Sequence, residues 1–155
     1  MLDLKRSGWR DGLGTFAGWM AQAGRILLDE ADVIVPVPLH YGRLAIRGFN
    51  QSAWLSGALS RRTGAPMVVD ALKRTRRTPT QGGLSARARR RNVAGAFALR
   101  PNPAGHIQGK RVLLIDDGCD PRGVHACPEV GRVAASGQVD VLVLARVVRE
   151  TDVTI

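Results

Sequence analysis

The sequence contains no apolar run of the roughly 18–20 residues that a helix needs to cross a bilayer. The first residues, from Met1 to Arg6, also lack the apolar segment and small-residue cleavage site of a secretory signal peptide. We therefore expect a cytoplasmic protein with no membrane insertion. Because 155 residues is the size of one domain, a single domain over residues 1–155 is expected.

Cysteine, histidine and aromatic residues are scarce. Cys119 and Cys127 are the only cysteines, and they do not form a Cys-x-x-Cys pair. With only 3 histidines, the chain has no recognisable zinc site, and the two thiols are expected to be free in a reducing compartment. Aromatic residues make up 5% of the chain, which leaves few platforms on which nucleic-acid bases could stack.

Positive charge is abundant. The formal net charge is +10, and arginine carries most of it. The planar, bidentate guanidinium group suits phosphate, so the composition favours an anionic partner. Charge alone does not distinguish a small phosphorylated ligand from a nucleic-acid backbone.

Hydrophobic periodicity predicts an α/β fold. Apolar residues at helical spacing predict helices over Trp9–Asp29 and Asn50–Thr63, with Asn50 as the N-cap of the second. Apolar runs without polar alternation predict buried strands at Val33–Val35, Met67–Val69, Val112–Ile115 and Val139–Val148. The alternation of strands and helices predicts a parallel sheet with helices on both faces.

A basic excursion separates the two halves of this pattern. Leu72–Asn92 is rich in arginine and poor in apolar residues, and Val93–Leu99 has the character of a returning strand. Long loops in compact domains are usually functional or disordered. We interpret residues of about 72–99 as a flexible basic hood that could close over an anionic ligand.

The strand Val112–Ile115 ends in Asp116 and Asp117. In open α/β sheets, ligands bind at the carboxyl ends of the strands. Adjacent carboxylates there can accept hydrogen bonds from ribose hydroxyls or hold Mg²⁺ through water. We therefore predict Asp116 and Asp117 as catalytic residues and as indirect Mg²⁺ ligands; the alternative is a pair of solvated turn residues.

Residues that could bind phosphate or pyrophosphate follow two of the strands. The loop after Asp117 offers Gly118, Arg122 and Gly123, where glycine lets the backbone approach an anion closely. Arg47 follows the first strand, and the excursion adds Arg74 and Arg77. Arg47 could equally be a solvated surface residue, and His40 is read as a turn residue rather than a base.

Four segments, in this order, resemble the competence-associated ComF family: VPVPLH, RGFNQS, RTRRTPTQGGLSARARRRNVAGAF and KRVLLIDD. The resemblance extends from about Val33 to Val148. It implies the type I phosphoribosyltransferase fold, with Asp116 and Asp117 placed to bind the ribose of phosphoribosyl pyrophosphate together with Mg²⁺. It also implies the family's association with competence, with single-stranded DNA or competence proteins as partners, and a homo-oligomer is a further expectation.

Two departures from the family pattern stand out. The chain lacks the N-terminal cysteine-rich zinc module that many members carry, which suggests a short member or a truncated gene. The phosphate loop, which usually reads like Asp-Asp-Val-x-Thr-Thr-Gly-Ala-Thr, is replaced by Asp116-Asp117-Gly118-Cys119-Asp120-Pro121-Arg122-Gly123-Val124. The hydroxyl groups for the 5′-phosphate are therefore absent. A pair of compensating frameshifts would produce such a patch, and resequencing the locus tests this.

Three functions remain open. The first is a phosphoribosyl pyrophosphate binder, with transfer of the phosphoribosyl group and loss of pyrophosphate as its reaction if it is an enzyme. The second is a non-enzymatic competence accessory protein that handles single-stranded DNA. The third is a degenerate family member that has lost its ligand. No acceptor substrate is indicated by the sequence.

Overall fold

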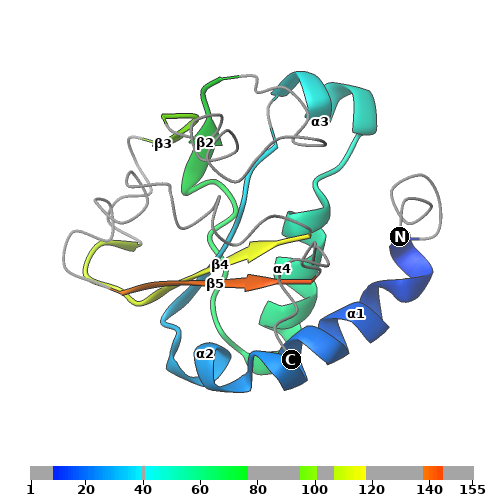
Figure 1. Cartoon of the computed structure of the whole chain (residues 1–155), viewed down its shortest axis with the longest axis vertical. Coiled ribbons are helices and arrows are strands. Elements are labelled where there is room, and N and C mark those ends of the chain that lie inside the picture. Colours follow the sequence, from blue (N-terminus) through cyan, green and yellow to red (C-terminus); the bar gives the residue numbers. More distant parts are fainter. Residues whose placement is uncertain (1–8, 40, 77–94, 101–106, 118–137, 145–155) are drawn as a thin grey trace, which may run out of the picture.

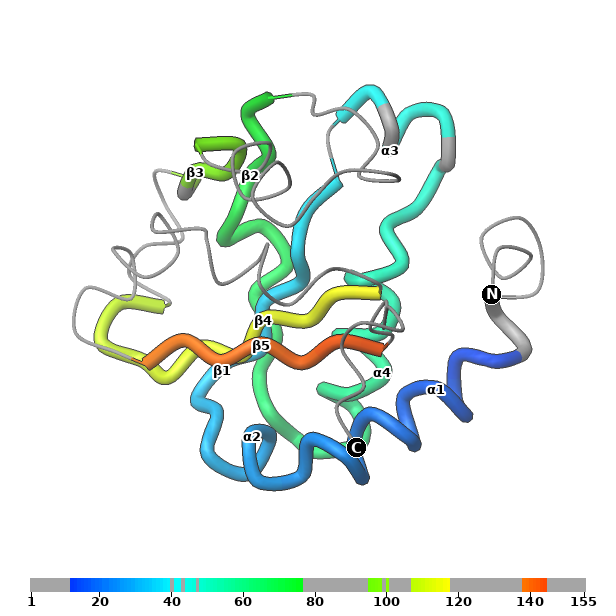
Figure 2. Tube along the Cα trace, in the orientation of Figure 1, coloured from blue at the N-terminus to red at the C-terminus, as the bar shows by residue number. Residues whose placement is uncertain are grey.

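The computed structural model describes residues 9–39, 41–76, 95–100, 107–117 and 138–144. Its centre is a sheet of three parallel strands, β1 (Val33–Pro36), β4 (Val112–Asp116) and β5 (Val139–Val143), in the order β1-β4-β5. Figure 2 shows β4 running beside β5 across the middle of the molecule. The predicted α/β fold with a parallel sheet is confirmed.

The strands β1 and β4 carry apolar side chains on both faces. Every residue of β1 and β4 is buried. The register pairs Val33 with Val112 and Ile34 with Leu113, so successive residues contribute alternately to two separate cores. This explains why these strands lack polar alternation in the sequence.

Helices cover one face of the sheet. α1 (Trp9–Ala23), α2 (Arg25–Glu30) and α4 (Gln51–Thr63) enclose a core with Ile34, Leu113 and Ile115. Leu55 and Leu59, one turn apart on α4, are fully buried there. Figure 1 shows α1 and α4 on the same side of the strands. No helix in these described ranges has the length and apolar character needed to cross a membrane.

The first predicted helix is divided in two. A single helix over Trp9–Asp29 was expected, but the structure ends α1 at Ala23 and begins α2 at Arg25. The break falls at Gly24, where a Cβ atom would lie only 2.6 Å from Leu142 Cδ2. A glycine at this point lets the helices pass close to β5, which the sequence pattern did not reveal.

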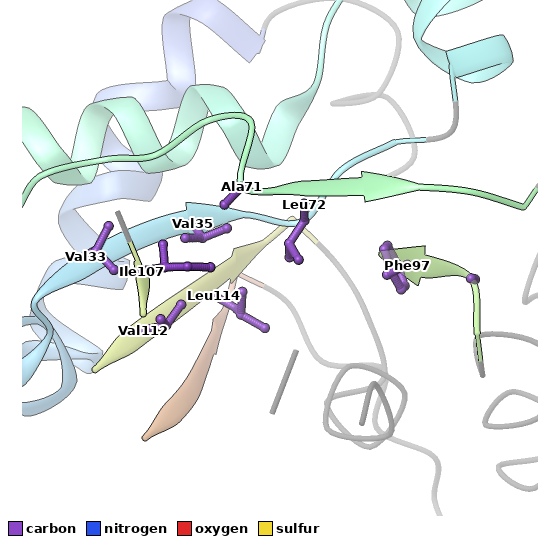
Figure 3. Packing of buried hydrophobic residues seen from close by; sticks show 9 residues of the cluster. Val33, Val35, Ala71, Leu72, Phe97, Ile107, Val112 and Leu114 are labelled. Atoms are coloured by element: carbon purple, nitrogen blue, oxygen red, sulfur yellow. The ribbon is translucent and has the colours of Figure 1, made fainter. Parts of the chain in front are cut away.

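The other face of the sheet is covered by a ribbon of two antiparallel strands, β2 (Leu72–Arg74) and β3 (Phe97–Leu99). Leu72 and Phe97 from this ribbon join Ile107 and the sheet residues in a second core (Figure 3). The basic excursion therefore starts as a strand at Leu72, where a loop was predicted, and Phe97–Leu99 confirms part of the returning strand. Residues 77–94, the rest of the predicted hood, lie outside the described residues.

Three further elements differ from prediction. The expected strand Met67–Val69 is reduced to a single parallel bridge between Met67 and Ile34, flanked by two backbone hydrogen bonds. α3 (Tyr41–Arg47) was not predicted, and Tyr41, Leu44 and Ile46 on it are exposed. β5 ends at Val143. The expected continuation to Val148, the helix after Asp117 and both cysteines lie outside the described residues.

Candidate functional site

The carboxyl ends of the strands meet at one edge of the sheet. Val37, just beyond β1, donates its backbone N–H to the carbonyl of Ile115 at 2.9 Å. Leu144, just beyond β5, donates to the carbonyl of Asp116 at 3.2 Å. Backbone hydrogen bonding thus continues to the last residue of β4. Asp116 lies on the central strand at the edge where open α/β sheets bind their ligands.

Asp116 is buried and held by two hydrogen bonds to one of its oxygens. The residue as a whole is only 7% exposed. Oδ1 accepts from the hydroxyl of Ser52 at 3.1 Å and from the backbone N–H of Asp117 at 2.9 Å. A buried carboxylate is costly unless hydrogen bonds compensate for the lost water, and these two donors supply that compensation. The side chain is therefore held in one orientation at the end of the strand.

Asp117 follows directly and is half-buried. It lies one residue beyond the end of β4, so two carboxyl groups follow each other at the carboxyl end of the central strand. Two acids in this position offer hydrogen-bond acceptors to the hydroxyl groups of a sugar. The catalytic and Mg²⁺-binding roles of Asp116 and Asp117 stay predictions.

The same two acids bear on the predicted Mg²⁺. Within the described residues, no three acidic, histidine or cysteine side chains gather into a metal site. Mg²⁺ in proteins is often held by one or two carboxylates, with the remaining positions taken by water and substrate phosphates. The hard oxygen donors of Asp116 and Asp117 fit that mode of binding, and they do not fit an ion caged by protein alone.

The first turn of α4 is fastened to the end of β1. Asn50 is the N-cap: its Oδ1 accepts from the backbone N–H of Ser52, and its Nδ2 donates to the carbonyl of Val37, both at 3.1 Å. Before it, Phe49 stacks on Trp54 with ring centroids 4.5 Å apart, a hydrophobic staple that fixes the angle at which the chain enters the helix. The predicted N-cap is confirmed.

Gln51, between Asn50 and Ser52, is fully buried. Neither its Nε2 nor its Oε1 has a hydrogen-bond partner in the described part of the chain. Buried amides without partners are rare in native proteins and call for a functional or energetic explanation. Gln51 therefore marks a costly polar position beside the site.

Sequence reasoning missed both Ser52 and Gln51. Each is a polar residue on the buried side of a helix whose other buried positions are Leu55, Ser56 and Leu59. The sequence did contain a signal, namely polar residues on an otherwise apolar helix face. Such side chains usually have a hydrogen-bond partner across the packing interface. The partner of Ser52 is 64 residues away in the chain, so its identity required the fold.

The predicted anion-binding arginines lie at two places. Arg47 is the last residue of α3, and the chain then turns at Gly48, whose φ of 75° favours glycine. Arg74 ends β2, where its guanidinium carbon lies 5.1 Å from the centre of the Phe97 ring. This cation–π contact joins the two strands of the ribbon. A ligand role for either arginine stays a prediction.

Four other predicted residues, Arg77, Gly118, Arg122 and Gly123, lie outside the described residues, as does His40. A groove of about 380 Å³ lies elsewhere, lined by Leu13 of α1, by Met67 and by residues of α4 including Trp54 and Arg61. Because Trp54 and Arg61 project from the side of α4 opposite Ser52, this groove is separate from the strand-end site.

Comparisons with known proteins confirm the predicted resemblance. The chain is 42% identical over 90 residues to Competence protein F of Haemophilus influenzae. It is 44% identical over 90 residues to DNA utilization protein YhgH of Escherichia coli K12. Each match covers 58% of this chain but only 39% and 38% of the relatives, so the chain corresponds to about two fifths of their length. No family model matches the chain.

The fold is shared with a solved amidotransferase. Glutamine phosphoribosylpyrophosphate amidotransferase from B. subtilis, in a complex with ADP and GMP, superimposes with a TM-score of 0.52. The superposition covers 86% of this chain and 26% of the amidotransferase, at 20% sequence identity. At that identity the likeness establishes the fold alone. The type I phosphoribosyltransferase-like fold predicted from the sequence is confirmed.

Proposed function

We propose that this protein binds phosphoribosyl pyrophosphate, or a related phosphorylated ribose, with Mg²⁺ at the carboxyl edge of the sheet. The observation that carries the proposal is the buried carboxylate of Asp116, held by Ser52 and followed by Asp117 at the end of the central strand. Burial and two hydrogen bonds are more than a solvated turn residue needs. The solved amidotransferase with a similar fold carries phosphoribosyl pyrophosphate in its name, and this supports the same proposal.

The proposed roles follow from position. Asp116 and Asp117 accept hydrogen bonds from the ribose hydroxyls and orient the water shell of Mg²⁺. Gly118, Arg122 and Gly123 approach the 5′-phosphate, where backbone N–H groups and one guanidinium compensate for missing threonines. Arg47, Arg74 and Arg77 neutralise the pyrophosphate. Bound Mg²⁺ would supply further positive charge to the pyrophosphate oxygens.

If the protein is an enzyme, the reaction is displacement at the anomeric carbon of the ribose. The bond from that carbon to the pyrophosphate oxygen breaks, and a bond to the acceptor's nucleophile forms. Arginine side chains then stabilise the charge on the departing pyrophosphate, which is the usual form of electrostatic catalysis for a phosphate leaving group. Binding is the primary proposal, and transfer follows only if an acceptor is found.

A second candidate function is the non-enzymatic handling of single-stranded DNA. Relatives in Escherichia coli are named DNA utilization protein YhgH, and this chain carries a net charge of +10. Arginine-rich surfaces bind nucleic-acid backbones with an affinity that falls steeply as salt rises. The low content of aromatic residues argues against stacking on bases, so any DNA binding would be mainly electrostatic.

Isothermal titration calorimetry separates the two. Phosphoribosyl pyrophosphate is titrated with Mg²⁺ into the wild type, Asp116→Ala and Asp117→Ala. Asp29→Ala is the matched control, because Asp29 is an exposed aspartate on α2, the helix that comes before the amino end of β1. The expected result is saturable binding by the wild type and the control, with loss of binding in both site variants.

Other outcomes decide against the primary proposal. Wild-type protein that binds no phosphoribosyl pyrophosphate, yet binds single-stranded DNA in a salt-sensitive manner, supports the second function. Absence of binding in both titrations identifies a degenerate member that has lost its ligand. Binding that survives in both aspartate variants would show that the ligand lies elsewhere on the protein.

A further inference from the structure

Two buried serines lie one helical turn apart on α4, and their surroundings differ. Ser52 is 2% exposed and Ser56 is fully buried. The hydroxyl of Ser52 donates to Asp116 Oδ1 at 3.1 Å. The hydroxyl of Ser56 has no hydrogen-bond partner in the described part of the chain. The same residue type, helix and degree of burial therefore occur once with a contact to the candidate site and once without it.

The backbone of Ser52 is fixed independently of Asp116. Its N–H donates to the N-cap Asn50, which is itself bonded to Val37 at the end of β1. One turn further along, Leu55 is fully buried in the core beneath the helix. The hydroxyl of Ser52 is thus carried by a helix anchored to β1 through its cap and to the sheet through its packing.

The two hydrogen bonds to Asp116 come from different elements. Ser52 donates from the first turn of α4, and Asp117 donates from the residue that follows β4. Both converge on Oδ1, so a rotation of the carboxyl group about its Cβ–Cγ bond would break at least one of them. The first turn of a helix also carries partial positive charge, which favours a carboxylate beside it.

We propose that Ser52 is a positioning residue, which holds the Asp116 carboxylate in the orientation that receives Mg²⁺ and the ribose hydroxyls. This inference rests on the proposed function and adds to it the residue that orders the site. Mutation of a residue that orients a metal-binding carboxylate typically lowers the metal affinity by about 10–100-fold. Ser52 does not itself touch the ligand in this scheme.

The test compares Ser52→Ala with Ser56→Ala in the full chain. Each change removes one buried hydroxyl from the same helix. The Mg²⁺ concentration that gives half-maximal binding of phosphoribosyl pyrophosphate is measured by calorimetry, and thermal unfolding is followed without ligand. We expect Ser52→Ala to raise the required Mg²⁺ concentration by about 10-fold and Ser56→Ala to leave it unchanged.

A merely structural role predicts a different pattern. If Ser52 only stabilised the helix, Ser52→Ala would lower the unfolding temperature and leave the Mg²⁺ requirement of the folded protein unchanged, which would overturn the inference. An equal rise in both serine variants would also overturn it. Wild-type protein that binds no phosphoribosyl pyrophosphate would remove the proposed function and this inference together, whereas normal binding by Ser52→Ala would remove this inference alone.

Discussion

Gly24 lies against the side chain of Leu142, so that a Cβ atom on the glycine would be 2.6 Å from Leu142 Cδ2 and 3.1 Å from the carbonyl oxygen of Met20. Gly24 joins α1 to α2, and Leu142 belongs to β5. The contact sets how closely the helical layer approaches the outer strand of the sheet. Because β5 reaches the carboxyl edge beside Asp116, the spacing at Gly24 is part of what supports the candidate site.

Gly24→Ala should therefore destabilise the protein. The added methyl group forces Leu142 out of its position, and overpacking of this kind costs about 1–3 kcal/mol. Gly14→Ala is the matched control, because nothing lies within 4 Å of a Cβ atom at Gly14 inside α1. Alanine there should stabilise the helix by about 0.5–1 kcal/mol. Urea denaturation measures the free energy of unfolding, which should fall for Gly24→Ala and rise for Gly14→Ala. A rise for Gly24→Ala would contradict the close contact with Leu142.

Asn50 gives a second prediction about the site's framework. Asn50→Ala removes both the cap of α4 and the bond to Val37, and loss of an N-cap alone costs about 0.5–2 kcal/mol. Asn50→Ser keeps a side-chain oxygen for the cap but cannot span to Val37 as the amide does. We expect the free energy of unfolding to fall in the order wild type, Asn50→Ser, Asn50→Ala. Equal stability of the wild type and Asn50→Ser would show that the Val37 bond contributes nothing, and equal stability of Asn50→Ser and Asn50→Ala would show the same for the cap.

The opposite end of the sheet depends on one arginine. Arg111 precedes β4, and its guanidinium contacts Glu30, the last residue of α2, and Asp140 in β5. Its backbone N–H donates to Asp32 at 2.7 Å. Arg111 is 27% exposed, so solvent screens these pairs only in part. Arg111→Met keeps an aliphatic side chain of similar length and should lower the free energy of unfolding by about 1 kcal/mol.

Salt distinguishes the charge contribution from packing in that variant. Raising the ionic strength should weaken the ion pairs of the wild type. The difference in the free energy of unfolding between the wild type and Arg111→Met should therefore become smaller. Denaturation at low and at high sodium chloride measures this. An advantage that does not change with salt would mean that Arg111 acts through packing and not through its charge.

The buried strands were predictable, because their residues have only one compatible environment. Val33–Val35 and Val112–Ile115 are β-branched or aliphatic throughout, and a run buried on both faces needs no periodicity to be recognised. The same argument placed Asp116 at the strand end. The N-cap Asn50 was predictable for a local reason, since its hydrogen bond to Ser52 spans only two residues.

Contacts between distant segments were not predictable in this way. The helix break at Gly24 depends on Leu142, which is 118 positions further along the chain by their residue numbers. Spacing alone therefore favoured one continuous helix. The strand Leu72–Arg74 was read as a loop because its charged residues dominate the pattern, although its pairing with Phe97–Leu99 buries Leu72. The partner of Ser52 required the same long-range information.

Gln51 provides the last prediction, since its amide is buried without a hydrogen-bond partner in the described part of the chain. Burial of an unpaired amide costs about 1–3 kcal/mol, and leucine has a similar size without that cost. Gln51→Leu should therefore raise the free energy of unfolding, while Gln22→Leu on the exposed side of α1 should change it little. The measurement is chemical denaturation without ligand. A destabilised Gln51→Leu would show that the amide has a partner in the native protein. A stabilised variant that binds phosphoribosyl pyrophosphate more weakly would indicate that the polar group is retained for the ligand, because function commonly maintains such costly groups against stability.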